Sequence, residues 1–192
     1  SNYNPATPKF TGTKVFDSHP LEEIRKYIDW GPFFIAWEMH GKYPQILTDA
    51  VVGKEATKLF NDANNLLDQV IKEKWLKARG VVGFYPATAT APDTVTIKDG
   101  VNLEFLRQQI KKAAGQPNIS LADFISPAGN DYIGGFSVTI SGIEEHIKRF
   151  QDSHDDYNKI MLQALADRLA EAFAEDLHEK VRKDFWGYAS DE

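Results

Sequence analysis

Three stripes run along the last long segment of the chain, which extends from His154 to Tyr188. Apolar residues recur every four positions, as on the buried face of an amphipathic helix. Acidic residues recur at the same step but are offset by two positions, or roughly 200° of helical rotation, so they face away from the apolar stripe. Small residues separate the two and leave room for a ligand or another backbone. The apolar stripe is Leu165, Leu169, Phe173, Leu177 and Val181, the acidic stripe is Asp167, Glu171 and Glu175, and the small stripe is Ala166, Ala170 and Ala174.

The acidic stripe has few basic neighbours on its own helix. Like charges four residues apart destabilise a helix by roughly 0.2–0.5 kcal/mol per pair, and opposite charges stabilise it by a similar amount. Asp167 has no basic residue three or four positions away, and Glu171 has only Arg168, whereas Asp176 can reach Lys180 and is ordinarily compensated. Two interpretations remain open. The stripe is a solvated face, or one of its acids meets a cation or hydrogen-bond donor from outside this helix.

The rest of the chain combines helical and β-like patterns. The predicted helices cover 21–29 and 48–75, with two more that begin at capping-box sequences near Ser141 and Ser153, and the predicted strands cover 80–87, 94–98 and 132–140. The apolar run 33–39 fits either a strand or a buried helix. Because the strands do not alternate regularly with helices, the pattern predicts an α+β fold with an antiparallel sheet.

Composition narrows the class of protein. A chain of 192 residues with 42% hydrophobic and 26% charged residues is typical of a soluble globular protein, and no apolar run approaches the roughly 18 residues of a membrane span. The net charge of −6 argues against nucleic-acid or anionic-membrane partners. Cysteine is absent, which excludes disulfides and thiolate metal sites. We expect a cytoplasmic protein in which Ser1 and Asn2 are a tag remnant and residues 1–13 form an extended lead-in.

Local motifs give little support for a catalytic or metal site. Gly134 and Gly135 do not belong to a dinucleotide-binding fingerprint, and no phosphate-binding loop motif is present. The five histidines never form the H-x-x-x-H or H-E-x-x-H spacing of a helical metal site, so we predict no metal ligands. From the residues alone, the chain is a soluble α+β domain with an acidic helix face.

Several segments closely resemble the C-terminal activation domain of cobalamin-dependent methionine synthase. They occur in the family's order and cover nearly the whole chain. The segments are YIDWGPFF, GKYPQIL, the run from Phe60 to Asp68, RGVVGFYPA, SLADFISP, DYIGGFSVT and HDDYNKIMLQALADRLAEAFAEDLHEKVRKDFWGY. The resemblance implies an α+β fold with a twisted antiparallel sheet flanked by long helices, with residues 14–192 as the larger, N-terminal part of an activation domain.

The same resemblance implies a role in methionine biosynthesis. In the family, the domain binds S-adenosylmethionine, which remethylates cobalamin after its Co(I) form has been oxidised to Co(II), with an electron from flavodoxin in many bacteria. The chain would then be part of a cytoplasmic methyltransferase, 5-methyltetrahydrofolate-homocysteine methyltransferase, whose cobalamin is held by a neighbouring domain. The family's ligand-binding acids align with Asp29 and Glu171, and no residue acts as acid, base or nucleophile. We expect Asp167, one turn before Glu171, to face the cobalamin-binding domain.

One departure from the family pattern concerns the end of the chain. The family's R-P-A-P-G-Y-P motif and a later aromatic residue follow the W-G-Y sequence, whereas this chain ends at Glu192. We therefore expect the 192-residue chain to bind S-adenosylmethionine weakly or not at all. Two alternatives stay open: a non-catalytic docking module that contacts the cobalamin domain or flavodoxin, and a hydrolase that uses Asp167 and Glu171 as a carboxylate pair.

Overall fold

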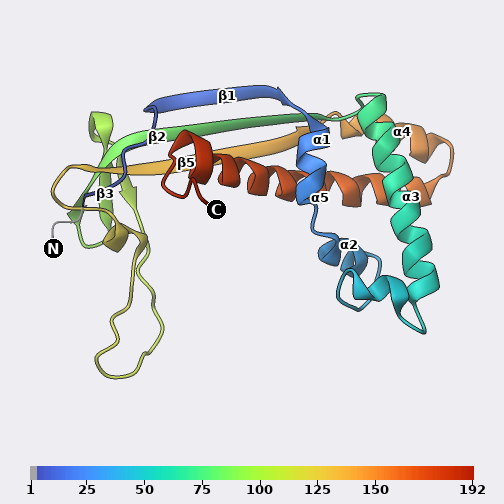
Figure 1. Cartoon of the computed structure of the whole chain (residues 1–192), viewed down its shortest axis with the longest axis horizontal. Coiled ribbons are helices and arrows are strands. Elements are labelled where there is room, and N and C mark those ends of the chain that lie inside the picture. Colours follow the sequence, from blue (N-terminus) through green and yellow to red (C-terminus); the bar gives the residue numbers. More distant parts are fainter. Residues whose placement is uncertain (1–3) are drawn as a thin grey trace. The chain divides into compact units, whose positions relative to one another are not determined.

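The computed structural model describes residues 4–192, so the predicted tag remnant at Ser1 and Asn2 lies outside the described residues. Figure 1 shows the helices and strands. The helices are α1 (Leu21–Ile24), α2 (Trp30–Ala36), α3 (Gly53–Lys72), α4 (Ile143–Asp152) and α5 (Asp156–Lys180), and the strands are β1 (Gly12–His19), β2 (Lys77–Ala91), β3 (Thr94–Ile97), β4 (Asn102–Glu104) and β5 (Asp131–Ser141). Short 3-10 turns occupy Arg25–Tyr27, Gln45–Thr48, Lys98–Gly100 and Leu121–Phe124, and a π-helical turn, Val181–Phe185, follows α5. The structure therefore confirms the predicted α+β class.

The five strands form one sheet in the order β1-β2-β3-β4, with β5 also paired to β2. Strand β3 is antiparallel to both β2 and β4. Contacts along β1 and β2 run in opposite directions, because Thr13 contacts Tyr85 while Asp17 contacts Arg79. The same holds for β2 and β5, where the Ser141 hydroxyl donates to the backbone oxygen of Lys77 and Gly134 lies beside Phe84. The sheet is therefore antiparallel, as predicted.

The chain divides into two compact units, each with its own apolar core. One unit comprises Val15–Gly80 and Ser137–His178, and the other comprises the segment ending at Lys14 together with Val81–Phe136 and Glu179–Glu192. The first unit buries most of the apolar stripe of α5 and also aromatic and aliphatic side chains of the N-terminal helices. Its fully buried members include Ile24, Phe33, Phe34, Leu67, Leu165, Leu169 and Phe173. The second unit contains a core cluster of Ala87, Val95 and Ala122, packed with Ile97, Phe105, Ile125 and Ile133.

The ambiguous apolar run near residue 33 belongs to a helix. Asp29 begins α2 by accepting a hydrogen bond from the Gly31 backbone amide, and Pro32 fits in the first turn because its missing N–H has no intrahelical partner there. The helix predicted over 21–29 is shorter than expected, because a 3-10 turn follows α1. Strand β1 was not predicted from the sequence.

Both predicted capping boxes are wrong. Helix α4 begins after Gly142, whose φ of 95° is left-handed and whose added Cβ would lie 2.7 Å from the Trp75 carbonyl oxygen. The Ser153 hydroxyl donates to the Arg149 carbonyl oxygen at the end of α4 instead of starting α5. Asp155 provides that start, because its carboxylate accepts the Asn158 backbone amide at 3.0 Å.

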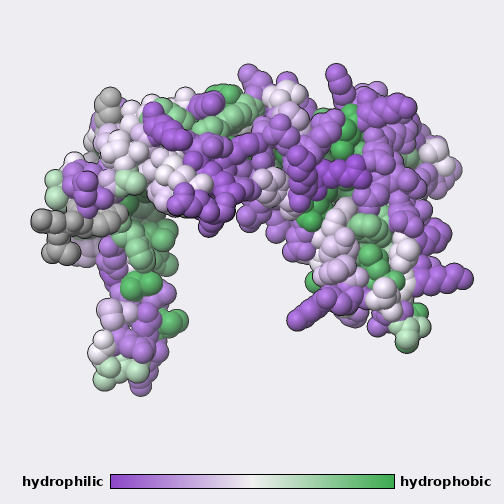
Figure 2. Space-filling model, viewed as in Figure 1, coloured by the Kyte–Doolittle hydropathy of each residue, from purple (hydrophilic) through white to green (hydrophobic). Residues whose placement is uncertain are grey.

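Hydrophilic residues cover most of the face visible in Figure 2. Apolar side chains gather on the segment between β4 and β5, where Leu106, Leu121 and Phe124 are exposed. Within the described residues, no helix combines the length and the apolar character that crossing a membrane requires.

Candidate functional site

Helix α5 presents the acidic stripe to solvent, as its sequence predicts. Its apolar stripe is buried, with Leu165, Leu169 and Phe173 fully enclosed, while Asp167 and Glu171 are exposed. The offset of two positions between the stripes places them on opposite sides of the helix. Solutes can therefore reach these carboxylates.

Glu171 has a partner on its own helix. The guanidinium of Arg168, three residues earlier, forms an ion pair with Glu171 Oε2. The Glu171 side chain nevertheless remains 54% exposed, against 19% for Arg168. An exposed pair of this kind contributes little to stability, because water screens it. The Glu171 carboxylate can therefore accept a hydrogen bond from another donor, either together with Arg168 or in its place.

Asp29 lies on a different element of the same compact unit. Its Oδ1 atom accepts the Gly31 backbone amide at 2.8 Å, which fixes the orientation of the carboxylate at the start of α2. The residue is exposed, so a donor from solvent can approach it. Within residues 4–192, no hydrogen bond or ion pair joins Asp29 to Glu171, and each has a local partner.

Asp167 lies one turn before Glu171 and is also exposed. Among the described residues it forms no hydrogen bond or ion pair, in keeping with the absence of basic neighbours in the sequence. It provides an uncompensated negative charge on the surface of α5.

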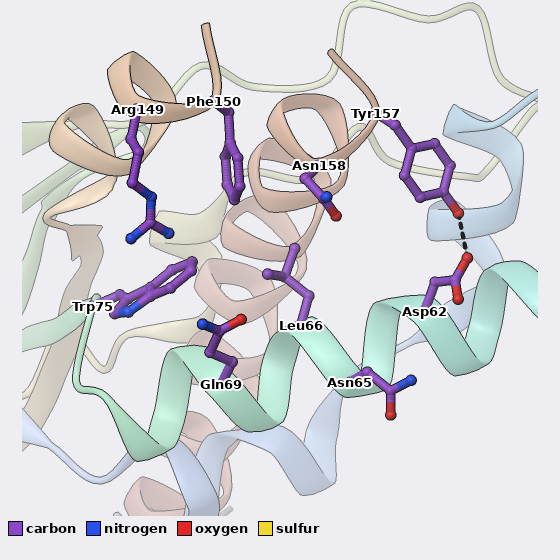
Figure 3. Close-up of a pocket in the computed structure, with 9 residues that line it drawn as sticks. All are labelled: Asp62, Asn65, Leu66, Gln69, Trp75, Arg149, Phe150, Tyr157 and Asn158. Atoms are coloured by element: carbon purple, nitrogen blue, oxygen red, sulfur yellow. Dashed lines mark hydrogen bonds between the residues drawn. The ribbon is translucent and has the colours of Figure 1, made fainter. Parts of the chain in front are cut away.

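A polar cavity lies elsewhere, between α3, the end of α4 and the start of α5 (Figure 3). This cavity has a volume of about 470 Å³. Arg149 lies over the Trp75 ring at 4.4 Å, and Tyr157 points at Asp62, to which it donates a 2.8 Å hydrogen bond. Asp29, Asp167 and Glu171 do not line this cavity. The lining residues are Asp62, Asn65, Leu66, Gln69, Trp75, Arg149, Phe150, Tyr157 and Asn158.

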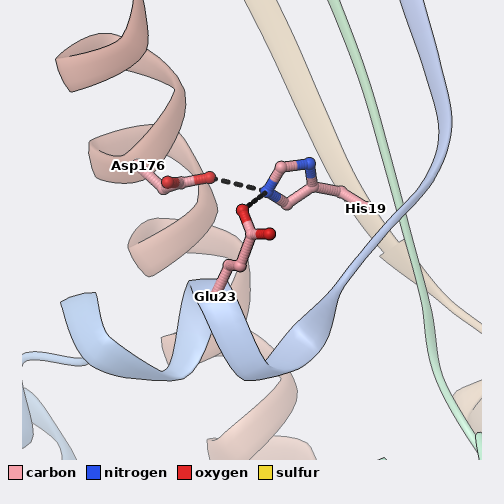
Figure 4. A group of neighbouring side chains, drawn as sticks. All are labelled: His19, Glu23 and Asp176. Carbon is pink, nitrogen blue, oxygen red and sulfur yellow. Dashed lines mark ion pairs between the residues drawn. The ribbon is translucent and has the colours of Figure 1, made fainter.

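A second group of side chains, which sequence reasoning missed, joins three elements. His19 at the end of β1, Glu23 on α1 and Asp176 on α5 direct their polar atoms at one another (Figure 4). The sequence suggests only that Asp176 can be compensated by Lys180; in the structure its side chain is 3% exposed, and it forms an ion pair with His19. A sequence signal for this burial exists. Asp176 follows Leu162 and Leu169 at steps of seven residues, so it continues an apolar face.

Comparisons with known proteins identify close relatives. A family model described as vitamin B12 dependent methionine synthase, activation domain, matches residues 20–192. Among solved structures, the chain is similar to the MetH reactivation domain bound to AdoHcy, with 47% sequence identity and a TM-score of 0.92. The similarity covers 99% of this chain and 61% of that chain. This chain thus spans about three fifths of the length of the solved relative.

Proposed function

Because the chain belongs to the activation-domain family of vitamin B12 dependent methionine synthase, we propose that it binds S-adenosylmethionine for the reductive remethylation of cobalamin. The observation that carries the proposal is the 47% identical relative, whose structure is bound to AdoHcy. AdoHcy is what remains of S-adenosylmethionine once its methyl group has been transferred. The wider assignment is a cytoplasmic methyltransferase of methionine biosynthesis, with flavodoxin or an equivalent protein as electron donor.

Asp29 and Glu171 are the residues proposed to hold S-adenosylmethionine. The ligand carries an ammonium group, a sulfonium and ribose hydroxyls, and ionised carboxylates accept charge-assisted hydrogen bonds from such donors. Both acids are exposed and belong to one compact unit, which suits this role. The Gly31 amide keeps the Asp29 carboxylate oriented before a ligand arrives. Glu171 is paired only with Arg168 at the surface, so a ligand ammonium competes with a weakly held guanidinium.

The residues of this chain have a positioning role in the proposed reaction. When bound, S-adenosylmethionine supplies the methyl group and the cobalamin of a neighbouring domain supplies the nucleophilic metal. Two oriented carboxylates on different elements fix the two polar ends of an extended ligand, which reduces the entropy cost of aligning the methyl group. No acid, base or nucleophile from this chain is required.

Asp167 is proposed to contact the cobalamin-binding domain. It is exposed one turn away from Glu171 and has no hydrogen-bonding partner among the described residues. A negative charge beside the ligand site attracts basic groups of a partner and fixes its register.

A reactivation assay in the complete enzyme tests the assignment. Asp29→Asn and Glu171→Gln keep the side-chain size but remove the charge, and loss of one charge-assisted hydrogen bond should raise the S-adenosylmethionine requirement about 10- to 100-fold. Ordinary turnover with methyltetrahydrofolate should be unchanged. Equal damage to both reactions would overturn the assignment.

A direct titration of the complete enzyme with S-adenosylmethionine examines the site itself. Glu175→Gln is the matched control, because Glu175 is exposed on the same helix one turn after Glu171. We expect Glu171→Gln to weaken binding and Glu175→Gln to leave it unchanged. Equal effects of the two substitutions would show that only the general negative charge of α5 matters.

A further inference from the structure

The cluster of His19, Glu23 and Asp176 concentrates three metal-type donors at one point. His19 Nε2 lies 2.8 Å from Asp176 Oδ2 and 3.5 Å from Glu23 Oε2. The three donor atoms all lie within 4.8 Å of one another, and Figure 4 shows both carboxylates directed at the same imidazole nitrogen. One nitrogen carries at most one proton and can satisfy only one carboxylate with a well-formed hydrogen bond. A metal ion at this point would contact all three donor atoms at once.

Burial makes the charge balance at this point important. The side chains of His19 and Asp176 are only 8% and 3% exposed, while that of Glu23 is 48% exposed. A divalent cation bound here would interact favourably with both ionised carboxylates and with the imidazole nitrogen. Imidazole and carboxylate ligands together suit first-row divalent metals.

The distances agree with coordination. Zinc lies about 2.0–2.2 Å from nitrogen and oxygen ligands, so two ligands of one ion are separated by about 2.9 Å at a right angle and about 3.4 Å at a tetrahedral angle. The separations from His19 Nε2, 2.8 Å and 3.5 Å, are close to these values. Small side-chain movements are therefore sufficient to admit an ion.

The surroundings hold the imidazole in place and give access to it. Its ring stacks on Phe173 with centroids 4.9 Å apart and meets the edge of Phe16 at 6.1 Å. His19 also lines a cavity of about 190 Å³ with Lys74 and Leu76, which provides a route for a small ion. A fixed ligand and an entry path are both expected of a metal site.

We propose that His19, Asp176 and Glu23 form a site for a first-row divalent cation of the Zn²⁺ class, with water completing the coordination. The ion joins β1, α1 and α5, and the site is independent of the proposed S-adenosylmethionine binding. Because such an ion binds the folded chain and not the unfolded one, it stabilises the fold.

Metal-free protein, prepared with a chelator, is titrated with Zn²⁺ by calorimetry and with Co²⁺ by visible absorption. We expect one ion per chain and Co²⁺ bands of inner-sphere coordination. A free Zn²⁺ concentration 100-fold above Kd should raise Tm by about 5–10 °C. His19→Gln and Glu23→Gln should each weaken binding by more than about 100-fold, because loss of a ligand exceeds the effect of an outer hydrogen bond.

Controls separate this site from adventitious binding. Glu55→Gln changes an exposed acid of α3 that does not line this cavity, and His40→Gln removes an exposed histidine, so both variants should bind Zn²⁺ normally. Asp176 is buried, and its replacement can disturb folding by itself, so the exposed Glu23 is the decisive position. The proposal would be overturned if Zn²⁺ did not bind in a one-to-one ratio, or if Glu23→Gln and His19→Gln bound it as tightly as the wild type. The cluster would then be a hydrogen-bonded histidine–carboxylate pair.

Discussion

The phenol of Tyr157 donates a 2.8 Å hydrogen bond to Asp62 Oδ2, and this bond joins the first turn of α5 to the middle of α3. Lys58, one turn earlier on α3, donates to the same oxygen at 2.7 Å. Burial, followed by the hydrogen bond to Asp62, raises the pKa of Tyr157 to about 12. The phenol therefore keeps its proton at physiological pH and remains a donor between the two helices.

Removal of the Tyr157 hydroxyl should weaken the contact between α3 and α5. We expect Tyr157→Phe to lower the free energy of unfolding by about 0.5–1.5 kcal/mol, the usual net contribution of one hydrogen bond. Tyr43→Phe is the control, because the Tyr43 hydroxyl makes no hydrogen bond among the described residues while its ring contacts Phe60. Urea unfolding of both variants provides the measurement. Equal losses would show that the Tyr157–Asp62 bond has no net effect on stability.

Two adjacent glycines of β5 should differ sharply in their tolerance of alanine. A Cβ at Gly134 would lie 2.8 Å from the Phe84 ring and 3.0 Å from the Trp186 ring, whereas a Cβ at Gly135 meets nothing within 4 Å. We expect Gly134→Ala to destabilise the protein by about 1–3 kcal/mol through overpacking. Gly135→Ala should change stability by less than about 0.5 kcal/mol. Thermal unfolding compares the two, and equal Tm values would contradict the close packing at Gly134.

Acid should weaken the contact between Arg107 and Asp123. The guanidinium donates to both carboxylate oxygens, at 2.7 and 2.9 Å. Hydrogen bonds from Arg107, and then from the Ser120 amide, lower the pKa of Asp123 from 3.8 to about 2. The folded state therefore binds fewer protons at this group than the unfolded state, so its contribution is present above about pH 4 and is lost as pH falls toward 2.

The measurement is the free energy of unfolding between pH 5 and 3 for the wild type and Asp123→Asn. We expect the wild type to lose stability more steeply as pH falls, because the variant has no carboxyl to protonate at this position. Asp152→Asn, which alters an exposed pair with Lys148, should keep the wild-type slope. If the stability of Asp123→Asn fell with pH as steeply as that of the wild type, Asp123 would not be a source of the acid sensitivity.

The main features of α5 could be predicted because helical periodicity fixes which residues share a face. The apolar stripe is buried and the acidic stripe is exposed, as the spacing implies. The burial of Asp176 was not predicted, because only the four-residue step was followed. A straight helix turns by about 100° per residue, so a four-residue stripe drifts around it, and seven residues return to within about 20°. Asp176 consequently lies almost directly above Leu169.

The residues of the candidate ligand site could be identified only from the family resemblance, because no local sequence pattern distinguishes them from similar acids. Glu171 is one of three similar acids on its stripe, and Asp29 also serves as an ordinary helix cap. The histidine cluster was missed for a different reason. His19 and Glu23 are four residues apart, but Asp176 is far away in the sequence, so no spacing rule could join it to them.

The Trp186 indole donates a 2.8 Å hydrogen bond to the carbonyl oxygen of Ala6, 180 residues away in the sequence. The Lys9 amide likewise donates to the Phe185 carbonyl oxygen at 3.0 Å. On a ribosome, these two contacts cannot form until residue 186 has left the exit tunnel, although their N-terminal halves were made first. The compact unit that contains them therefore completes its folding only after residue 186 has been synthesised. Until then, the segment that contains Ala6 and Lys9 lacks these two contacts.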